Sequence, residues 1–202
     1  MSCQADYYVS LNSPWTHLGG ARLMGVAKRY GASVRIYPID TGEVFPASGG
    51  LPLHKRSPQR QAYRLQDLAR WRDVLGIPIN LKPKHFPANE ATAAHCVLVV
   101  RETIGDPRAI DLAHRILKAL WEEEADTGDR ETLVRLISEI GLDGTSILER
   151  AGEPRWAALR SKETQAAIDR GVFGVPTYAV GETIFWGQDR LDFLERQMAV
   201  DR

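Results

Sequence analysis

Two kinds of hydrophobic pattern divide the chain, and the strand pattern begins near the N-terminus. Residues 6–11 combine Tyr, Val and Leu as a buried strand does, and residues 33–39 alternate between apolar and polar positions. Between them, residues 14–30 place apolar side chains three and four positions apart, which predicts a helix ending at Gly31. A strand, a helix and a strand in this order predict two parallel strands with a right-handed crossover.

The strand pattern returns only near the C-terminus. Residues 175–180 and 183–186 predict two strands, and the short turn between them contains Gly181. Two strands joined by such a turn are typical of a hairpin. A last helix is predicted from Gly187 onward, because apolar residues then recur at helical spacing.

The middle of the chain has the helical pattern instead. Residues 41–56 are rich in Gly and Pro and predict a loop, and Asp106 is expected to cap the strongest of the following helices. Helices are predicted over residues 60–75, 106–121 and 129–140, through 96–100, and in shorter form near 146–151 and 156–170. We therefore expect an α/β protein in which both ends of the chain build one sheet and the helical block is an insertion between them.

Composition and charge exclude several classes of function. The chain has 202 residues, and 26 basic side chains balance 26 acidic ones, so a nucleic-acid partner is not expected. A membrane protein is not expected either, because no apolar run reaches the roughly 20 residues of a membrane span. Residues 1–6 lack the basic and apolar segments of a signal peptide, and we therefore predict a cytoplasmic protein.

The cysteines and histidines do not indicate a redox or metal centre. Cys3 and Cys96 lie far apart in sequence, and no Cys-x-x-Cys motif occurs, which excludes a dithiol redox centre. Both are predicted to be thiols, since a reducing compartment disfavours disulfides. The five histidines show no spacing typical of metal ligands, so no metal site is expected.

The most informative short stretch is Ser13-Pro14, at the junction of the first strand and the first helix. A Ser at the N-cap and a Pro at the first helical position are typical of a helix N-terminus. The hydroxyl of Ser13 is thereby placed beside free N–H groups and the positive end of the helix dipole, which favours an anion. A plain cap and an anion site are both compatible with these residues.

Several stretches together resemble one known family. The most specific are Ser13-Pro14, Phe86-Pro87-Ala88-Asn89, Val172-Phe173-Gly174-Val175-Pro176-Thr177 and Trp186-Gly187-Gln188-Asp189-Arg190-Leu191. From end to end, the chain is similar to the kappa-class glutathione transferases and the 2-hydroxychromene-2-carboxylate isomerases. These form a DsbA-like branch of the thioredoxin superfamily that carries Ser in place of Cys-x-x-Cys.

The resemblance implies a thioredoxin-like fold with a large helical insertion. Residues 1–42 and 157–202 would form the thioredoxin-like domain, and residues 43–156 would form the inserted helical domain. In this superfamily a cis-proline lies opposite the active residue, at the place of Pro176. Taken alone, a proline at the start of a strand is usually trans.

The resemblance also implies a glutathione site. Ser13 would be the catalytic residue, because it would stabilise the thiolate of the cofactor. The other cofactor-binding residues would be Val175, Pro176, Trp186, Gly187, Gln188 and Asp189. The Val175 backbone would pair with the cysteinyl part of glutathione, and the helix end at Gln188 and Asp189 would hold its γ-glutamyl end.

The resemblance further implies a glutathione-dependent isomerase of an aromatic 2-oxo-acid, in which the thiolate adds reversibly to the substrate. A kappa-like transferase uses the same Ser and remains open, as does a non-catalytic DsbA-like protein that binds a thiol or peptide. Candidate substrate-binding residues are Arg60 first, with Lys55 and Arg56 after it, for a carboxylate. Tyr63, Trp186 and Asn89 are candidates for an aromatic pocket. Tyr63 fits a hydrophobic core equally well. Related chains are dimers, so a homodimer is expected.

Overall fold

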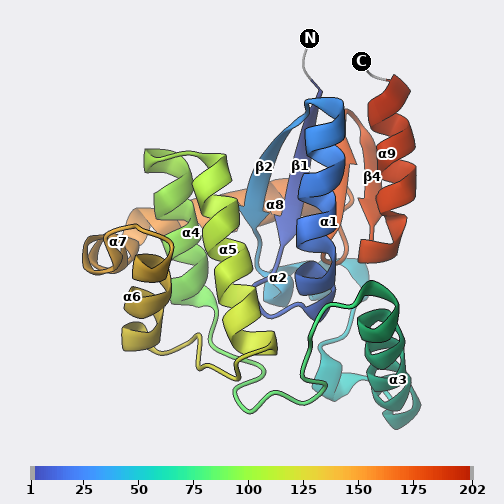
Figure 1. Cartoon of the computed structure of the whole chain (residues 1–202), viewed down its shortest axis with the longest axis horizontal. Coiled ribbons are helices and arrows are strands. Elements are labelled where there is room, and N and C mark those ends of the chain that lie inside the picture. Colours follow the sequence, from blue (N-terminus) through green and yellow to red (C-terminus); the bar gives the residue numbers. More distant parts are fainter. Residues whose placement is uncertain (1–2, 201–202) are drawn as a thin grey trace.

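The computed structural model describes residues 3–200 and contains a four-stranded sheet in the order β2-β1-β3-β4. β1 (Gln4–Val9) and β2 (Ser33–Pro38) are parallel. β3 (Thr177–Val180) lies antiparallel to both β1 and β4 (Thr183–Trp186). The two ends of the chain therefore build one sheet, and the expected hairpin is confirmed (Figure 1).

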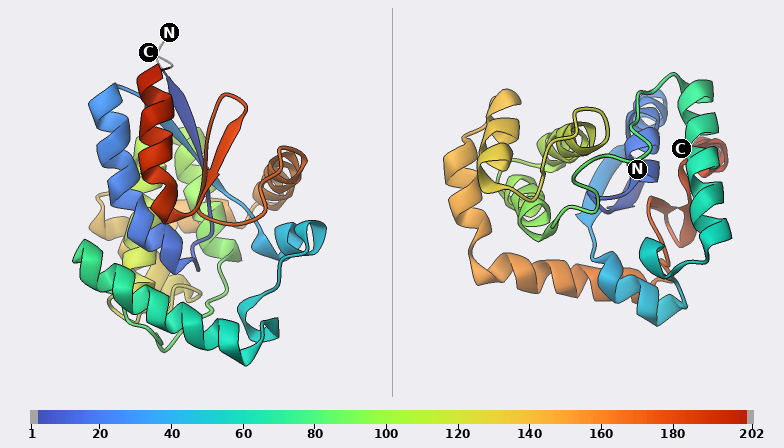
Figure 2. Two further views of the ribbon diagram at one scale, coloured as in Figure 1. Left: turned by 90° about the vertical axis from the view of Figure 1, so that its right-hand side faces the viewer. Right: turned by 90° about the horizontal axis from the view of Figure 1, so that it is seen from below.

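Helices cover both faces of this sheet. α1 (Pro14–Tyr30) and α9 (Leu191–Val200) pack side by side on one face, and α8 (Pro154–Asp169) lies across the other (Figures 1 and 2). The buried side chains divide accordingly into a large cluster beneath α1 and a smaller one on the α8 side. The smaller cluster consists of Tyr8, Ile39, Val44, Ala167, Val172 and Ala179.

The helical block packs beside β2. It consists of α4 (Ala91–Thr103), α5 (Asp106–Trp121), α6 (Arg130–Glu139) and α7 (Gly144–Ala151). α4 and α5 contact β2, and α6 and α7 pack on their outer side (Figure 1). α3 (Pro58–Leu75) contacts α1 (Figure 2) and reaches the C-terminal end of α5, where Arg64 lies over the Trp121 ring. Within residues 3–200, none of the helices combines the length and apolar character needed to cross a bilayer.

α1 lies very close to its neighbours at two consecutive glycines. A Cβ on Gly19 would lie 2.5 Å from the Tyr178 hydroxyl oxygen, and a Cβ on Gly20 would overlap the His114 ring. Any larger side chain would push α1 away from β3 and α5. This close approach explains why two residues that weaken a helix occur inside a buried one.

Residues 41–56 do not form a loop, so that prediction is wrong. They contain α2 (Thr41–Ser48) and a short 3-10 turn, η1 (Leu53–Lys55). The Asp40 carboxylate caps α2 by accepting a backbone N–H at 2.7 Å. The Val44 side chain is fully buried in the smaller core cluster. Capping and burial therefore stabilise a short helix despite its Gly and Pro residues.

Asp106 does not cap α5 with its side chain, which corrects a second prediction. α5 begins at Asp106 itself, and the carboxylate accepts the Ile36 N–H at 3.0 Å. The same carboxylate lies 3.5 Å from the Arg35 guanidinium. Both partners lie on β2, so the acid joins α5 to the sheet instead of closing the end of the helix.

Candidate active site

Ser13 occupies the N-cap of α1 and is 8% exposed. Its hydroxyl oxygen accepts a hydrogen bond from the Thr16 N–H at 3.2 Å, so the predicted cap is confirmed. This bond fixes the oxygen and leaves the hydroxyl proton available for donation. The Ser13 O–H and the N-terminal end of α1 together favour a negative charge beside them.

The peptide bond before Pro176 is cis, and the strand register places this proline near the turn that leads to Ser13. Thr177 pairs with Tyr8 on the antiparallel strand β1. Pro176 therefore lies level with Val9, the last residue of β1. Because Ser13 follows β1 through a short turn, its hydroxyl and the cis-proline lie at the same edge of the sheet, the one at which β1 ends and β3 begins.

Val175 presents unused backbone groups at this edge. Neither its N–H nor its C=O takes part in a hydrogen bond within residues 3–200. The neighbouring carbonyls, in contrast, have partners: Pro176 accepts the Gly187 N–H at 2.9 Å, and Gly174 accepts the Thr177 hydroxyl at 2.7 Å. An extended peptide has free donor and acceptor groups to pair with at Val175.

Phe173 and Trp186 form an exposed aromatic pair next to the cis-proline. Their ring centroids lie 4.7 Å apart, and the two residues are 41% and 52% exposed. Trp186 pairs in register with Thr177, the residue after Pro176. Gly174 lies against the indole, since a Cβ there would be 2.5 Å from Nε1. The pair offers an apolar surface on which an aromatic ligand can stack.

Gln188 and Asp189 begin the last helical segment as a 3-10 turn, η2 (Gln188–Arg190), which continues into α9. The Gln188 side chain is buried, and its Oε1 accepts a hydrogen bond from Arg22 at 2.6 Å. The Asp189 carboxylate is exposed and lies 2.6 Å from the Arg190 guanidinium. Of these two predicted residues, only Asp189 presents its side chain to solvent.

Arg60 and Tyr63 lie exposed on α3, and Asn89 lies exposed just before α4. Tyr63 is 58% exposed, so it is not a core residue, and the Arg70 guanidinium lies 5.6 Å from its ring centroid. The Asn89 side chain accepts a backbone N–H of α4 at 3.3 Å. No hydrogen bond or ion pair within the described part of the chain joins these three side chains to Ser13.

Asn12 connects the turn before Ser13 to a distant segment. Its amide nitrogen donates to the Ala88 carbonyl at 2.9 Å, and its amide oxygen accepts the Ala88 N–H at 3.0 Å. Ala88 follows the cis peptide bond between Phe86 and Pro87. The pairing therefore brings the irregular segment before α4 against the turn that carries Ser13.

A buried carboxylate lies beneath the same turn, and the sequence analysis did not identify it. Glu90 accepts the Ser10 hydroxyl at 2.7 Å and the Asn12 N–H at 3.0 Å, both through Oε2. Its Oε1 accepts a hydrogen bond from Arg160 on α8 at 2.9 Å. Burial raises the pKa of Glu90, while Arg160 and the two hydrogen bonds oppose that rise. Glu90 and Arg160 are 70 positions apart, so no local motif reveals the pair.

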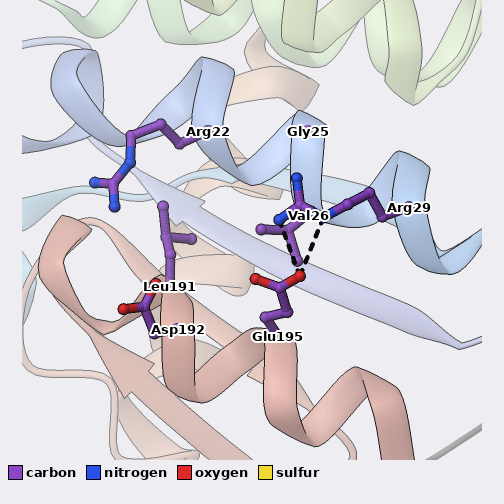
Figure 3. A pocket seen from close by; sticks show the side chains of 7 residues that line it. All are labelled: Arg22, Gly25, Val26, Arg29, Leu191, Asp192 and Glu195. Atoms are coloured by element: carbon purple, nitrogen blue, oxygen red, sulfur yellow. Dashed lines mark hydrogen bonds and ion pairs between the residues drawn. The ribbon is translucent and has the colours of Figure 1, made fainter. Parts of the chain in front are cut away.

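Two surface pockets flank these elements. One, of about 230 Å³, lies between α1 and α9 beside the ion pair of Arg29 with Glu195, and none of the predicted site residues lines it (Figure 3). The other, of about 390 Å³, is lined by residues 84–89 with Asp126 and Gly128. Within residues 3–200, no group of three or more His, Cys, Asp or Glu side chains is placed to hold a metal ion.

Comparisons with known proteins support this interpretation of the fold. The family model of the DSBA-like thioredoxin domain matches residues 4–199. The 2-hydroxychromene-2-carboxylate isomerase of Pseudomonas putida is 32% identical over 201 residues, covering 96% of this chain and 93% of the relative. The protein of the same name from Sphingobium xenophagum is 29% identical, covering 96% of this chain and 97% of the relative.

Solved structures give the same result. A 2-hydroxychromene-2-carboxylate isomerase superposes with a TM-score of 0.84 at 27% identity, covering 97% of this chain and 94% of that chain. The cytosolic disulfide reductase DsbM from Pseudomonas aeruginosa, solved with GSH, superposes with a TM-score of 0.67 at 19% identity, covering 97% and 99%. The second likeness shows the fold alone. The chain belongs to the DSBA-like thioredoxin family and, within it, to the family of 2-hydroxychromene-2-carboxylate isomerases, which confirms the resemblance and the fold class.

Proposed function

We propose that this protein is a glutathione-dependent isomerase of the 2-hydroxychromene-2-carboxylate type, which acts on an aromatic 2-oxo-acid. The observation that carries the proposal is the Ser13 hydroxyl at the N-terminus of α1, at the same sheet edge as cis-Pro176. The chain around it is related over nearly its whole length to proteins that bear the isomerase name. With Ser in place of Cys-x-x-Cys, this edge is suited to binding a thiol and not to exchanging disulfides.

The proposed role of Ser13 follows from its geometry. Bound glutathione supplies a thiolate nucleophile that adds to the substrate and later leaves. The Ser13 O–H donates a hydrogen bond to the sulfur, while the Thr16 N–H holds the Ser13 oxygen in place. The N-terminal end of α1 adds a favourable electrostatic field. Both effects favour the thiolate over a thiol, whose ordinary pKa is about 8.5.

The remaining contacts to glutathione are assigned to groups that can still form hydrogen bonds or ion pairs. The Val175 N–H and C=O, which have no partner within residues 3–200, would pair with the cysteinyl part of glutathione. The exposed Asp189 carboxylate would bind the ammonium of the γ-glutamyl end. Gln188 would contribute backbone groups only, because its side chain already binds Arg22. Gly187, with φ 109°, lets the chain turn sharply into η2.

The aromatic substrate is proposed to lie between the sheet edge and α3. The exposed pair of Phe173 and Trp186 would stack on its ring. Tyr63 and Arg60 are exposed on α3, and Asn89 lines the pocket formed by residues 84–89. We assign these three side chains to the opposite wall of the substrate site.

The proposal is tested with 2-hydroxychromene-2-carboxylate and a catalytic amount of glutathione. An isomerase converts many equivalents of substrate while the concentration of free thiol stays constant. A transferase consumes one thiol for each product molecule, and a non-catalytic binding protein gives no turnover at all. Ser13→Ala should lower kcat/KM at least tenfold and should cost about 1 kcal/mol of stability through the lost cap.

A matched variant separates these two effects of Ser13. Asp143 caps α7 in the same way, by accepting the Ser146 N–H at 3.0 Å, but α7 lies in the helical block. Asp143→Ala should lose comparable stability and keep full activity. Equal activity of Ser13→Ala and the wild type would contradict the assigned role. We further propose that the protein is a homodimer, and sedimentation at micromolar concentration would show a monomer if this is wrong.

A further inference from the structure

Arg64 on α3 holds its guanidinium against two aromatic rings. Its Cζ lies 5.3 Å from the centroid of Phe86 and 5.8 Å from that of Trp121. The two rings themselves pack 4.9 Å apart. Trp121 is fully buried, and Arg64 is partly buried in front of it. The cation is therefore held in an ordered, largely apolar environment.

This arginine has no anionic partner in the part of the chain that the structure describes. No ion pair and no hydrogen bond of its side chain is found within residues 3–200. Arg22, which is also partly buried, binds Gln188 and not a carboxylate. Four other buried or partly buried arginines bind carboxylates. The pairs are Arg101 with Glu163, Arg115 with Glu139, Arg160 with Glu90, and Arg170 with Asp6. A partly buried charge without a counter-ion is costly, and such groups cluster at functional sites.

A second cation, that of Arg56, is close enough to Arg64 to act on it electrostatically. Arg56, just before α3, donates through Nε to the Leu51 carbonyl at 2.8 Å, which orders its side chain. Burial, reinforced by the charge of Arg56, lowers the pKa of the Arg64 guanidinium to about 10. Arg64 nevertheless remains charged at neutral pH, because its pKa still lies well above 7. Neither guanidinium has a carboxylate partner within residues 3–200, so together they create a positive potential that an anion would relieve.

The chain of contacts from this cation leads to the proposed active site. Arg64 stacks on Phe86, and the segment that follows Phe86 is fixed by the two hydrogen bonds between Ala88 and Asn12. Asn12 immediately precedes Ser13. α3 also contacts α1 and passes beside its N-terminal end (Figure 2). Arg64 and Ser13 are thereby connected through Phe86, Ala88 and Asn12, beside the N-terminal end of α1 (Figure 2).

We propose that Arg64, assisted by Arg56, binds the carboxylate of the aromatic substrate. The inference rests on the proposed function, in which the substrate is a carboxylate attached to an aromatic ring system. A planar guanidinium donates two parallel N–H hydrogen bonds to a carboxylate, and apolar surroundings strengthen this interaction. The Phe86 ring packs against the guanidinium and restricts where the substrate carboxylate can bind. The reacting carbon is thereby directed toward the sulfur beside Ser13.

Glutathione also carries a carboxylate, on its glycyl residue, so the experiment must separate the two sources. The variant is Arg64→Met, which keeps an unbranched apolar side chain against Phe86 and Trp121 and removes the charge. Arg64→Lys keeps the charge and loses the planar two-point contact. Arg72→Met is the matched control, because the Arg72 side chain, on the same helix, is 40% exposed and within residues 3–200 has only its neighbour Asp73 as an ion-pair partner.

Each protein is assayed with 2-hydroxychromene-2-carboxylate and with 2-hydroxychromene, which lacks the carboxylate, both at saturating glutathione. Arg64→Met should raise KM for the carboxylate at least tenfold and leave kcat/KM for the neutral compound unchanged. Arg64→Lys should fall between Arg64→Met and the wild type, and Arg72→Met should match the wild type. The dissociation constant of glutathione, measured by calorimetry, should stay the same in all four proteins.

Three results would overturn the inference. If Arg64→Met weakens the binding of glutathione and leaves KM for the substrate unchanged, Arg64 binds the glycyl carboxylate of glutathione. If it impairs both substrates equally, Arg64 has only a packing role. If Arg64→Met changes neither the substrate kinetics nor the binding of glutathione, the Arg64 cation binds neither ligand. A wild type without turnover would sink the proposed function separately. Calorimetry without glutathione then still tests whether Arg64 binds a carboxylate. Chromone-2-carboxylate should bind at least tenfold more tightly than chromone-2-carboxamide, and this preference should occur only in proteins that keep Arg64.

Discussion

The side chain of Asn12 and the backbone of Ala88 form a reciprocal pair of hydrogen bonds, at 2.9 and 3.0 Å. An amide side chain thereby satisfies a donor and an acceptor of an irregular segment that has no strand partner. The pair fixes the turn before Ser13 relative to the segment that carries Phe86 and Asn89. The position of the Ser13 hydroxyl thus depends on a contact between segments 76 positions apart.

Removing this contact should lower both stability and activity. Asn12→Ala loses two hydrogen bonds and leaves two backbone groups partly buried, which costs about 1–3 kcal/mol. We expect kcat/KM to fall roughly tenfold, since 1.4 kcal/mol of lost positioning energy corresponds to that factor. Asn80→Ala is the control, because Asn80 donates to the Glu122 carbonyl at 3.2 Å outside the site. Urea unfolding and steady-state kinetics on both variants check the prediction, and equal activities would contradict it.

The buried pair of Glu90 and Arg160 makes a second prediction. Glu90→Gln leaves the buried Arg160 guanidinium with only the more distant Asp40 carboxylate, at 3.4 Å, as counter-charge, and should destabilise the protein by up to about 3 kcal/mol. Because Glu90 also binds Ser10 and Asn12, the variant should lose activity at temperatures where it is still folded.

A comparison with a second buried pair isolates this effect. Glu163→Gln removes one of two carboxylates that pair with the buried Arg101, at 2.6 Å, and leaves Glu102 at 2.8 Å. It should lose similar stability and keep its kcat/KM. If both variants lose activity in parallel with their melting temperatures, Glu90 has only a structural role.

These contacts show where sequence analysis succeeds and where it stops. The strands and α1 follow from local periodicity, and the Ser13 cap depends on residues only three positions apart. α2 is missed because its stability comes from the Asp40 cap and from burial of Val44 against other elements. The Glu90–Arg160 pair could not be predicted from the sequence, because its two residues lie 70 positions apart and meet only in the folded chain. The same holds for Gln188, whose side chain is occupied by Arg22.

The pH dependence of stability should reflect a buried histidine. Burial lowers the pKa of His114 from the ordinary 6.5 to about 4. Between these values the unfolded chain binds a proton that the folded protein does not, so stability falls as the pH falls from about 6.5 to 4. The loss for this one group is about 3 kcal/mol. Urea unfolding at pH 7 and 4.5 measures it.

A neutral substitution tests whether His114 is responsible. His114→Gln should reduce the difference in unfolding free energy between the two pH values, even if it lowers the stability at pH 7. His54→Gln, at an exposed histidine, should behave like the wild type. An unchanged pH dependence in His114→Gln would assign the effect to other groups, of which His17, whose pKa is also lowered by burial, is the first to examine.

The last prediction concerns the recognition of glutathione. If Val175 and Asp189 bind the tripeptide, reduced glutathione should bind with a micromolar to millimolar dissociation constant. S-methyl-glutathione keeps the backbone and helix-end contacts but cannot act as a nucleophile, so it should inhibit competitively with glutathione. Cys-Gly lacks the γ-glutamyl group and should bind more weakly by about 1–3 kcal/mol, the usual value of a charge-assisted hydrogen bond.

Asp189→Ala should weaken the binding of glutathione by a similar amount. It should also remove most of the preference for glutathione over Cys-Gly, because neither ligand then has a contact at the γ-glutamyl end. Asp192→Ala removes an exposed carboxylate nearby on α9 and should bind both ligands as the wild type does. Titration calorimetry of two ligands against three proteins completes the cycle. If Asp189→Ala weakens glutathione and Cys-Gly equally, the carboxylate does not contact the γ-glutamyl end. If the wild type binds neither ligand at millimolar concentration, the glutathione-dependent mechanism is wrong, and a binding protein of the same fold becomes the better description.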